Sequence, residues 1–144
     1  PYNGVYRVSQ SGVVSILIDS ITRPNGIIFL PGDKKFIVAN SDPEKAIWYE
    51  FALNEKDSVQ QGRIFYNATS YAATEGGLPD GLKADSQGNI FASGPGGIWI
   101  LNESGNVLGK IKLPAPAANC ALSPDEKTLY ITADMYLLRV KMRD

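Results

Sequence analysis

The chain repeats one short pattern three times. Each copy is a turn rich in Gly, Pro, Asp or Ser that leads into a run of β-branched and aromatic residues. The copies lie at 30–38 (LPGDKKFIV), 84–92 (ADSQGNIFA) and 123–131 (SPDEKTLYI). They align on one apolar position, which is occupied by Phe36, Ile90 and Leu129. Repeats of roughly 40 to 55 residues with four strands each are typical of a β-propeller, so an all-β fold is predicted.

Short apolar runs between turn residues predict strands along the whole chain, whereas no segment keeps a long helical apolar period. The polar stretches 54–61 and 68–78 are interpreted as loops. The predicted strands lie near 4–8, 13–18, 25–30, 35–40, 46–53, 62–67, 80–84, 89–93, 97–101, 107–112, 118–122, 127–132 and 135–142.

These strands group into blades of four antiparallel strands. Residues 24–67 and 79–112 each supply a full blade. Residues 4–18 supply two strands of a preceding blade, and 118–142 supply three strands of an incomplete one. About three blades are present, whereas a stable propeller needs about four or more. Residues 1–144 are therefore interpreted as part of one propeller domain, with open edges covered by a missing N-terminal half or by self-association.

Composition excludes several classes of function. The 144 residues carry a net charge of -1 and no basic cluster, which argues against nucleic acid or an anionic membrane as partner. Histidine is absent, so a Ser-His-Asp triad or a His-based zinc site cannot form from this sequence. Cys120 is the single cysteine, which excludes an internal disulfide and predicts a small buried apolar residue. The cellular compartment is left open.

Two tripeptides place an oxygen-bearing side chain at the same point of successive repeats. PNG at 24–26 and PDG at 79–81 each open an inner strand of a predicted blade. Around a common axis, Asn25 and Asp80 would face one spot, and their oxygens suit a hard cation. Both tripeptides are also common turn sequences, so turn chemistry is the alternative. The repeat spacing also reaches Asn119, which either lines the pocket or bonds to backbone at a strand start.

Further motifs complete a recognisable series. In chain order they are NGVYR (3–7), RPNGI (23–27), LPDGL (78–82), GPGGIW (94–99), ANCA (118–121) and KTLYITA (127–133). In order and spacing, this series resembles the C-terminal half of bacterial gluconolactonases of the SMP-30/gluconolactonase/LRE family. The resemblance extends over residues 3–142, and it is the series rather than any single motif that makes it specific.

The resemblance implies a partial six-bladed β-propeller with a divalent cation at the mouth of its central channel. Asn25 matches the family's asparagine ligand and Asp80 its aspartate ligand. The glutamate ligand of the family belongs to an N-terminal half that this sequence does not contain. Calcium is the cation expected from the resemblance, with Zn²⁺, Mg²⁺ and Mn²⁺ as alternatives.

The leading hypothesis is a metal-dependent lactonase whose substrate is a sugar lactone such as glucono-1,5-lactone. The cation would polarise the lactone carbonyl, and Asp80 would serve as a metal ligand and as the catalytic general base. Arg23 and Asn119 are the weaker candidates for substrate contacts. The alternative is a non-catalytic propeller that acts as a binding or scaffold module and keeps a structural ion.

The remaining conspicuous residues are interpreted structurally. The glycine-rich segment 94–97 lacks phosphate-loop spacing and a following helix, so it is predicted to be a hairpin connection. Trp48 and Trp99 are expected to pack between blades. Solvated hairpin turns are predicted at Asp33, Asp85 and Asp125.

Overall fold

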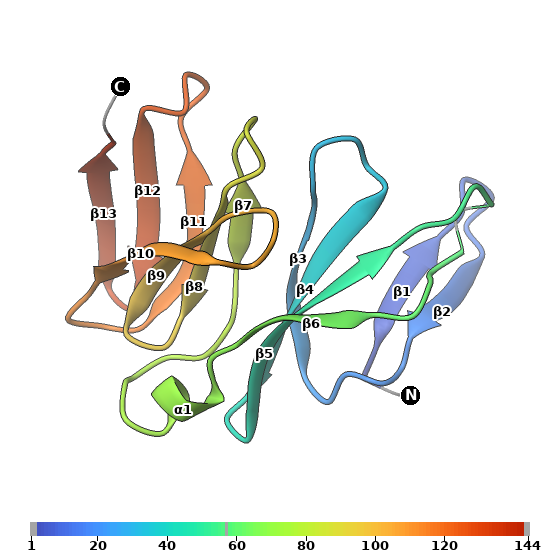
Figure 1. Cartoon of the computed structure of the whole chain (residues 1–144), viewed down its shortest axis with the longest axis horizontal. Helices are drawn as coiled ribbons and strands as arrows, with labels where there is room; N and C mark the ends of the chain where they lie inside the picture. The colour runs from blue at the N-terminus through green and yellow to red at the C-terminus, as the bar shows by residue number, and fades with distance from the viewer. Residues whose placement is uncertain (1–2, 57, 143–144) are drawn as a thin grey trace.

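The computed structural model describes residues 3–56 and 58–142, which form four antiparallel sheets (Figure 1). The first two sheets consist of Val5–Val8 (β1) and Val14–Ile18 (β2), and of Pro24–Phe29 (β3), Lys35–Asp42 (β4), Lys45–Ala52 (β5) and Arg63–Asn67 (β6). The other two consist of Leu82–Ala84 (β7), Ile90–Gly94 (β8), Gly97–Leu101 (β9) and Val107–Lys112 (β10), and of Ala117–Leu122 (β11), Thr128–Ala133 (β12) and Tyr136–Lys141 (β13).

The sheets are arranged around an axis. Within each sheet the strands follow chain order, so every connection is a hairpin between antiparallel neighbours. The first strands of the last three sheets lie together, because β7 contacts β3 on one side and β11 on the other. This combination of sequential four-stranded sheets and clustered inner strands is the architecture of part of a β-propeller.

The predicted strand pattern is confirmed. All thirteen strands occur within a few residues of the positions predicted from sequence. The prediction of a loop over 68–78 is wrong in one detail, because Thr69–Ala72 forms a single helical turn, α1. The side chain of Asn67 accepts a hydrogen bond from the Thr69 backbone N–H at 3.0 Å, which starts this turn. A local hydrogen bond between a side chain and the backbone leaves no apolar period in the sequence.

Neighbouring sheets bury their side chains against each other. In β4, alternate residues point to opposite faces, so Phe36 packs toward β1 and β2 while Ile37 packs toward the β7–β10 sheet. This is why β4 and β8 are buried almost throughout. The aligned residues Phe36, Ile90 and Leu129 are all buried, and each faces the preceding sheet. The repeat read from the sequence is therefore a repeat in packing.

Aromatic residues fill the space between the two complete sheets. Trp48 on β5 and Trp99 on β9 are buried, with ring centroids 6.0 Å apart. Tyr66 on β6 and Tyr71 on α1 contact Trp99 at 5.2 and 4.9 Å. The expected packing role of both tryptophans is confirmed, and α1 contributes Tyr71 to the edge of this cluster.

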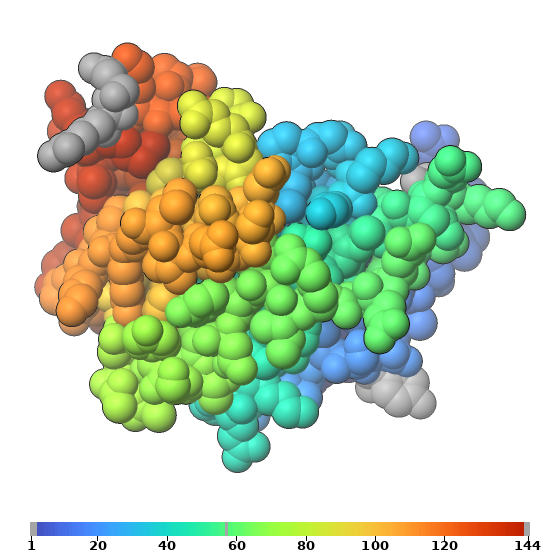
Figure 2. Space-filling model, in the orientation of Figure 1, coloured from blue at the N-terminus to red at the C-terminus, as the bar shows by residue number. Residues whose placement is uncertain are grey.

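The two ends of the arc expose apolar side chains. In the space-filling view, the blue segment that contains β1 and β2 and the red segment that contains β13 lie at opposite ends of the molecule (Figure 2). Val14 is 62% exposed at one end and Leu137 is 74% exposed at the other. In the part of the chain that the structure describes, β13 pairs only with β12. Among these same residues, no helix is long and apolar enough to span a bilayer.

Candidate cation and lactone site

Asn25 and Asp80 line the same cavity. Asn25 is the second residue of β3, and Asp80 lies two residues before β7. Because β3 and β7 are neighbouring inner strands, their starting ends bring both side chains to a cavity of 530 Å³. Ser41 at the end of β4 and Asp134 in the turn between β12 and β13 also line it. Three of the four sheets thus contribute to one cavity.

The side chain of Asn25 is held by Ser41. Its Nδ2 donates a hydrogen bond to the Ser41 hydroxyl oxygen at 3.0 Å. That hydroxyl in turn donates to the backbone carbonyl of Pro79, which is the residue before Asp80. A short chain of hydrogen bonds therefore joins the start of β3, the end of β4 and the segment that leads into β7.

Asp80 is half-buried, and its backbone continues the pairing of β7 with β8. Its N–H donates to the Ser93 carbonyl at 3.1 Å, which fixes the chain at this residue. Burial raises the pKa of the Asp80 carboxyl above its usual value, while hydrogen bonds from the Gly81 backbone and the Asn25 side chain oppose the rise. The carboxylate is thus partly removed from water and is stabilised by neutral donors.

The lining of the cavity contains groups that could hold a hard cation. Its described lining contains two aspartates, an asparagine and a serine, and neither lysine nor arginine. Amide and carboxylate oxygens are ligands that hard divalent cations such as Ca²⁺ prefer. Within the described residues, no group of three or more His, Cys, Asp or Glu side chains could hold a metal. The residues present therefore fit as a partial ligand set, in which Asn25 and Asp80 leave several positions to water, substrate or other protein groups.

A glycine after each of the first two candidate residues allows the inner strands to approach closely. Gly26 lies against the backbone carbonyl of Asp80, and Gly81 lies against the side chain of Asn119. Gly81 also donates its N–H to the Ala118 carbonyl at 2.8 Å, which links two neighbouring sheets. The glycine in PNG and PDG thus has a packing role, and neither tripeptide is only a turn signal.

Arg23 does not line the Asn25/Asp80 cavity. It borders a separate cavity of 410 Å³ with Asn3, Gly4, Tyr6 and Pro24. Its backbone N–H donates to the side-chain oxygen of the buried Asn40 at 2.7 Å. A substrate contact by Arg23 would therefore lie in this separate cavity and not in the one lined by Asn25 and Asp80.

Asn119 also lines a different cavity, of 290 Å³, together with Lys83, Tyr130 and Leu137. Its Oδ1 accepts a hydrogen bond from the backbone N–H of Cys120 at 2.8 Å. Ala118 lines the Asn25/Asp80 cavity instead. A shift in the β11–β12 register between Ala117 and Asn119 accompanies this displacement along the strand.

The sequence analysis missed Ser41 and Asp134. Ser41 lies on the second strand of its sheet, outside the aligned tripeptides. Asp134 occupies a hairpin turn with φ of 51°, a left-handed conformation in which Asp and Asn are enriched. The repeat alignment contains a signal for both, because Ser41 lies five residues after Phe36 and Asp134 lies five residues after Leu129. The two residues therefore occupy the same position in their repeats, next to the turn that ends the second strand.

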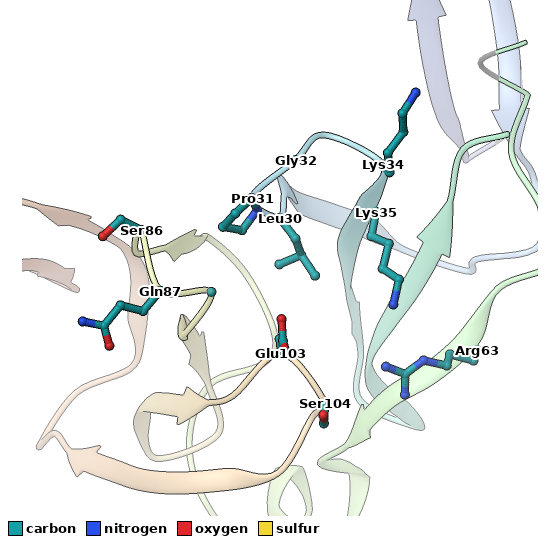
Figure 3. Close-up of a pocket in the computed structure, with 11 residues that line it drawn as sticks. Leu30, Pro31, Gly32, Lys34, Lys35, Arg63, Ser86, Gln87, Glu103 and Ser104 are labelled. Atoms are coloured by element: carbon teal, nitrogen blue, oxygen red, sulfur yellow. The ribbon is translucent and has the colours of Figure 1, made fainter. Parts of the chain in front are cut away.

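A larger cavity of 690 Å³ lies at the other end of β3 (Figure 3). Lys35 and Arg63 extend from one wall and Glu103 lies on the other. Both cationic side chains pair with the buried Glu50, at 3.5 Å from Lys35 and at 2.7 Å from Arg63. This cavity contains none of the predicted site residues, so the Asn25/Asp80 cavity is the better candidate for chemistry.

Comparison with known proteins finds lactonases among the relatives of this chain. A gluconolactonase from Zymomonas mobilis is 34% identical over 146 residues, which cover 99% of this chain and 41% of the relative. The solved structure of a gluconolactonase from Xanthomonas campestris superposes with a TM-score of 0.83 at 26% identity, covering 97% of this chain and 44% of that protein. A pentonolactonase from Haloferax volcanii is 25% identical over 89% of this chain and 44% of its own length.

The chain thus spans less than half the length of each of these relatives. Residues 1–134 match the region that defines one protein family, and this match extends over nearly the whole chain. The sequence resemblance to that family is confirmed. The chain belongs to the SMP-30/Gluconolactonase/LRE-like family.

Proposed function

We propose that the protein hydrolyses sugar lactones with the help of a divalent cation, and that this chain supplies part of the cation site. The observation that carries the proposal is that Asn25 and Asp80, which belong to successive sheets, line one cavity whose described lining contains neither lysine nor arginine. The gluconolactonase and pentonolactonase relatives support lactones as the substrate class.

A bound cation would supply Lewis-acid polarisation of the lactone carbonyl. Asn25 contributes a neutral amide oxygen to the ligand set, and Asp80 contributes an anionic one. The Asp80 carboxylate also accepts a proton from the attacking water as the oxygen of that water bonds to the carbonyl carbon. The ester bond of the ring then breaks, and its oxygen takes up a proton to give the open hydroxy acid.

Calcium is the cation proposed first. Its coordination sphere accepts six to eight oxygen ligands in a flexible geometry, so two protein oxygens leave room for water and substrate. Mg²⁺ demands a stricter octahedron, and Zn²⁺ prefers nitrogen and sulfur ligands to the oxygens present here. Mn²⁺ shares the preference for oxygen and remains an alternative.

The test is an assay of glucono-1,5-lactone hydrolysis, in which the rate is measured from the release of protons. The assay compares untreated protein with protein that has been treated with a chelator. Activity is expected to fall on chelation and to return with calcium chloride. Asp80→Asn keeps the shape of the side chain and removes its charge, so it is expected to abolish most of the activity. Asp125→Asn, in an exposed hairpin turn, is the matched control.

Near-normal turnover of Asp80→Asn would overturn the catalytic assignment. Calcium binding with no hydrolysis of any sugar lactone would instead favour the scaffold alternative. Full activity after complete removal of divalent cations would overturn the dependence on metal while leaving lactone hydrolysis in place.

A further inference from the structure

An asparagine can serve as a cation ligand only in one orientation of its amide. The Oδ1 atom can bind a cation, whereas the NH₂ group at the other end can only donate hydrogen bonds. Because the two ends of the amide have nearly the same shape, a neighbouring hydrogen-bonding group must determine which end faces the cavity. In this structure the group next to the Asn25 amide is the hydroxyl of Ser41.

The hydrogen bonds of Ser41 fix which end of the amide it accepts. Its hydroxyl has a single proton, and that proton is donated to the Pro79 carbonyl, which cannot act as a donor itself. Pro79 is a buried residue, and Ser41 supplies a hydrogen-bond donor to its carbonyl. Toward Asn25, the Ser41 oxygen can then only accept, and only the NH₂ end of the amide can satisfy it.

The opposite end of the amide is left for the cavity. Nδ2 of Asn25 is held by Ser41, and Asn25 lines the cavity together with Asp80. Oδ1 is therefore the end of the amide that is available to a cation.

We infer that Ser41 is a positioning residue, which holds the Asn25 amide so that Oδ1 rather than Nδ2 is offered to the cation. This inference rests on the proposed cation site and assigns Ser41 no contact with the cation or the substrate. Residues that orient a metal ligand in this way typically change metal affinity by about 10- to 100-fold when they are removed.

The experiment is a calorimetric titration of the protein with calcium chloride. Ser41→Ala removes the acceptor for Nδ2 and is expected to weaken calcium binding by about 10-fold or more. Ser41→Thr keeps the hydroxyl and is expected to retain most of the affinity. Ser123→Ala is the matched control, because Ser123 is also half-buried and its hydroxyl also bonds to the backbone, but in the hairpin turn that follows β11. Circular dichroism of each variant checks that it is folded.

A double substitution separates orientation of the amide from general support of the fold. In Asn25→Asp both side-chain oxygens are acceptors, so there is no amide left to orient. Ser41→Ala is therefore expected to weaken calcium binding much less in the Asn25→Asp background than in the native one. If Ser41→Ala does not fold, Ser41→Cys keeps the volume with a weaker hydrogen-bonding group and is compared in the same two backgrounds.

The outcomes distinguish this inference from the function on which it rests. Equal calcium affinity of the native protein and Ser41→Ala would overturn the role of Ser41 and leave the cation site intact. An equal loss in both backgrounds would likewise overturn it, because the effect would not act through the amide. Absence of calcium binding by the native protein would overturn the proposed cation site and the inference together.

Discussion

The Cα of Gly26 packs against the backbone carbonyl of Asp80. A Cβ built on Gly26 would lie 2.1 Å from that oxygen and 2.6 Å from the Leu82 side chain, distances that no real side chain could keep. The glycine that follows one candidate ligand therefore sets how closely the other can approach. Gly81 repeats the relationship one sheet further on, where a Cβ would lie 2.2 Å from Oδ1 of Asn119.

Gly26→Ala is expected to push the starts of β3 and β7 apart. The added methyl group meets backbone rather than a flexible side-chain end, so the strands must shift, at a cost of about 1–3 kcal/mol in the free energy of unfolding. The same shift separates Asn25 from Asp80 and is expected to weaken calcium binding. Urea denaturation and calcium titration measure the two effects.

Gly109→Ala is the control for this substitution. Gly109 lies on β10, and a Cβ there would have nothing within 4 Å. The variant is expected to match the native protein in both measurements. If Gly26→Ala also left both the free energy of unfolding and the calcium affinity unchanged, the close approach of β3 and β7 at their starts would contribute to neither.

Asp134→Asn tests whether the β11–β13 sheet contributes to substrate binding. Asp134 lines the same cavity as Asn25 and Asp80, and its carboxylate can accept hydrogen bonds from sugar hydroxyls. Asparagine tolerates the left-handed backbone of this turn, so the fold is expected to persist. Loss of the charge is expected to raise KM for the lactone by roughly 3- to 10-fold, with a smaller effect on kcat.

Asp33→Asn provides a control with the same kind of backbone. Asp33 has φ of 55° in the turn that follows β3, at the end of that strand remote from Asn25. Steady-state kinetics of this variant are expected to match those of the native protein. A drop in kcat for Asp134→Asn at unchanged KM would argue against a binding role and for a closer involvement in the chemistry.

The repeat pattern predicted the fold from sequence because packing between sheets demands it. Phe36, Ile90 and Leu129 recur because each second strand must present an apolar side chain to the preceding sheet. The same repetition predicted that Asn25 and Asp80 share a location. The arrangement of the sheets and the starts of the inner strands could thus be predicted from the sequence.

The strand register and the local hydrogen bonds could not be predicted from the repeat pattern. Repeat spacing places Asn119 at the position that corresponds to Asp80, yet Ala118 lines the cavity, and the register of β11 shifts next to it. A displacement of one residue along a strand turns a side chain to the other face. The role of Ser41 could not be predicted for another reason, since it depends on a hydrogen bond to Pro79 from a different sheet.

Glu50 forms ion pairs with Lys35 and Arg63, which line the cavity at the other end of β3, and these pairs are expected to contribute to the free energy of unfolding. Glu50 is 5% exposed, and its carboxylate accepts hydrogen bonds from Arg63 Nε at 3.0 Å and from a second guanidinium nitrogen at 2.7 Å. Glu50→Gln is expected to lower the free energy of unfolding by about 1–2 kcal/mol, because the neutral amide replaces one acceptor by a donor that faces Arg63. The value stays small because Arg63 is half exposed and regains water.

Urea denaturation measures this change, and Glu44→Gln is the control. Glu44 lies in the exposed turn between β4 and β5, so removing its charge is expected to leave stability nearly unchanged. Addition of salt is expected to narrow the difference between the native protein and Glu50→Gln only slightly, because the carboxylate is buried. Equal stability of the two would mean that the ion pair contributes nothing to the fold.

Cys120 makes stability depend on pH in the alkaline range. Burial raises the pKa of its thiol from 9.0 to about 11, and its Sγ contacts the Phe91 carbonyl at 3.3 Å. The folded state therefore favours the neutral thiol, and this contribution is fully present below pH 9. As the pH rises from 9 toward 11, the unfolded chain loses its proton first and the contribution is lost.

Between pH 8 and pH 10, this single group is expected to lower the free energy of unfolding by roughly 1 kcal/mol. Cys120→Ala removes the thiol, and the cavity it leaves lowers stability by an amount that does not depend on pH. The difference in stability between the native protein and Cys120→Ala should therefore shrink over this range, even though lysines and tyrosines titrate in both. Urea denaturation at several pH values measures that difference, and a constant value would show that the thiol ionises equally readily in the folded and unfolded chains. Iodoacetamide provides an independent check, since the native protein is expected to react slowly at pH 8 and the urea-unfolded chain rapidly.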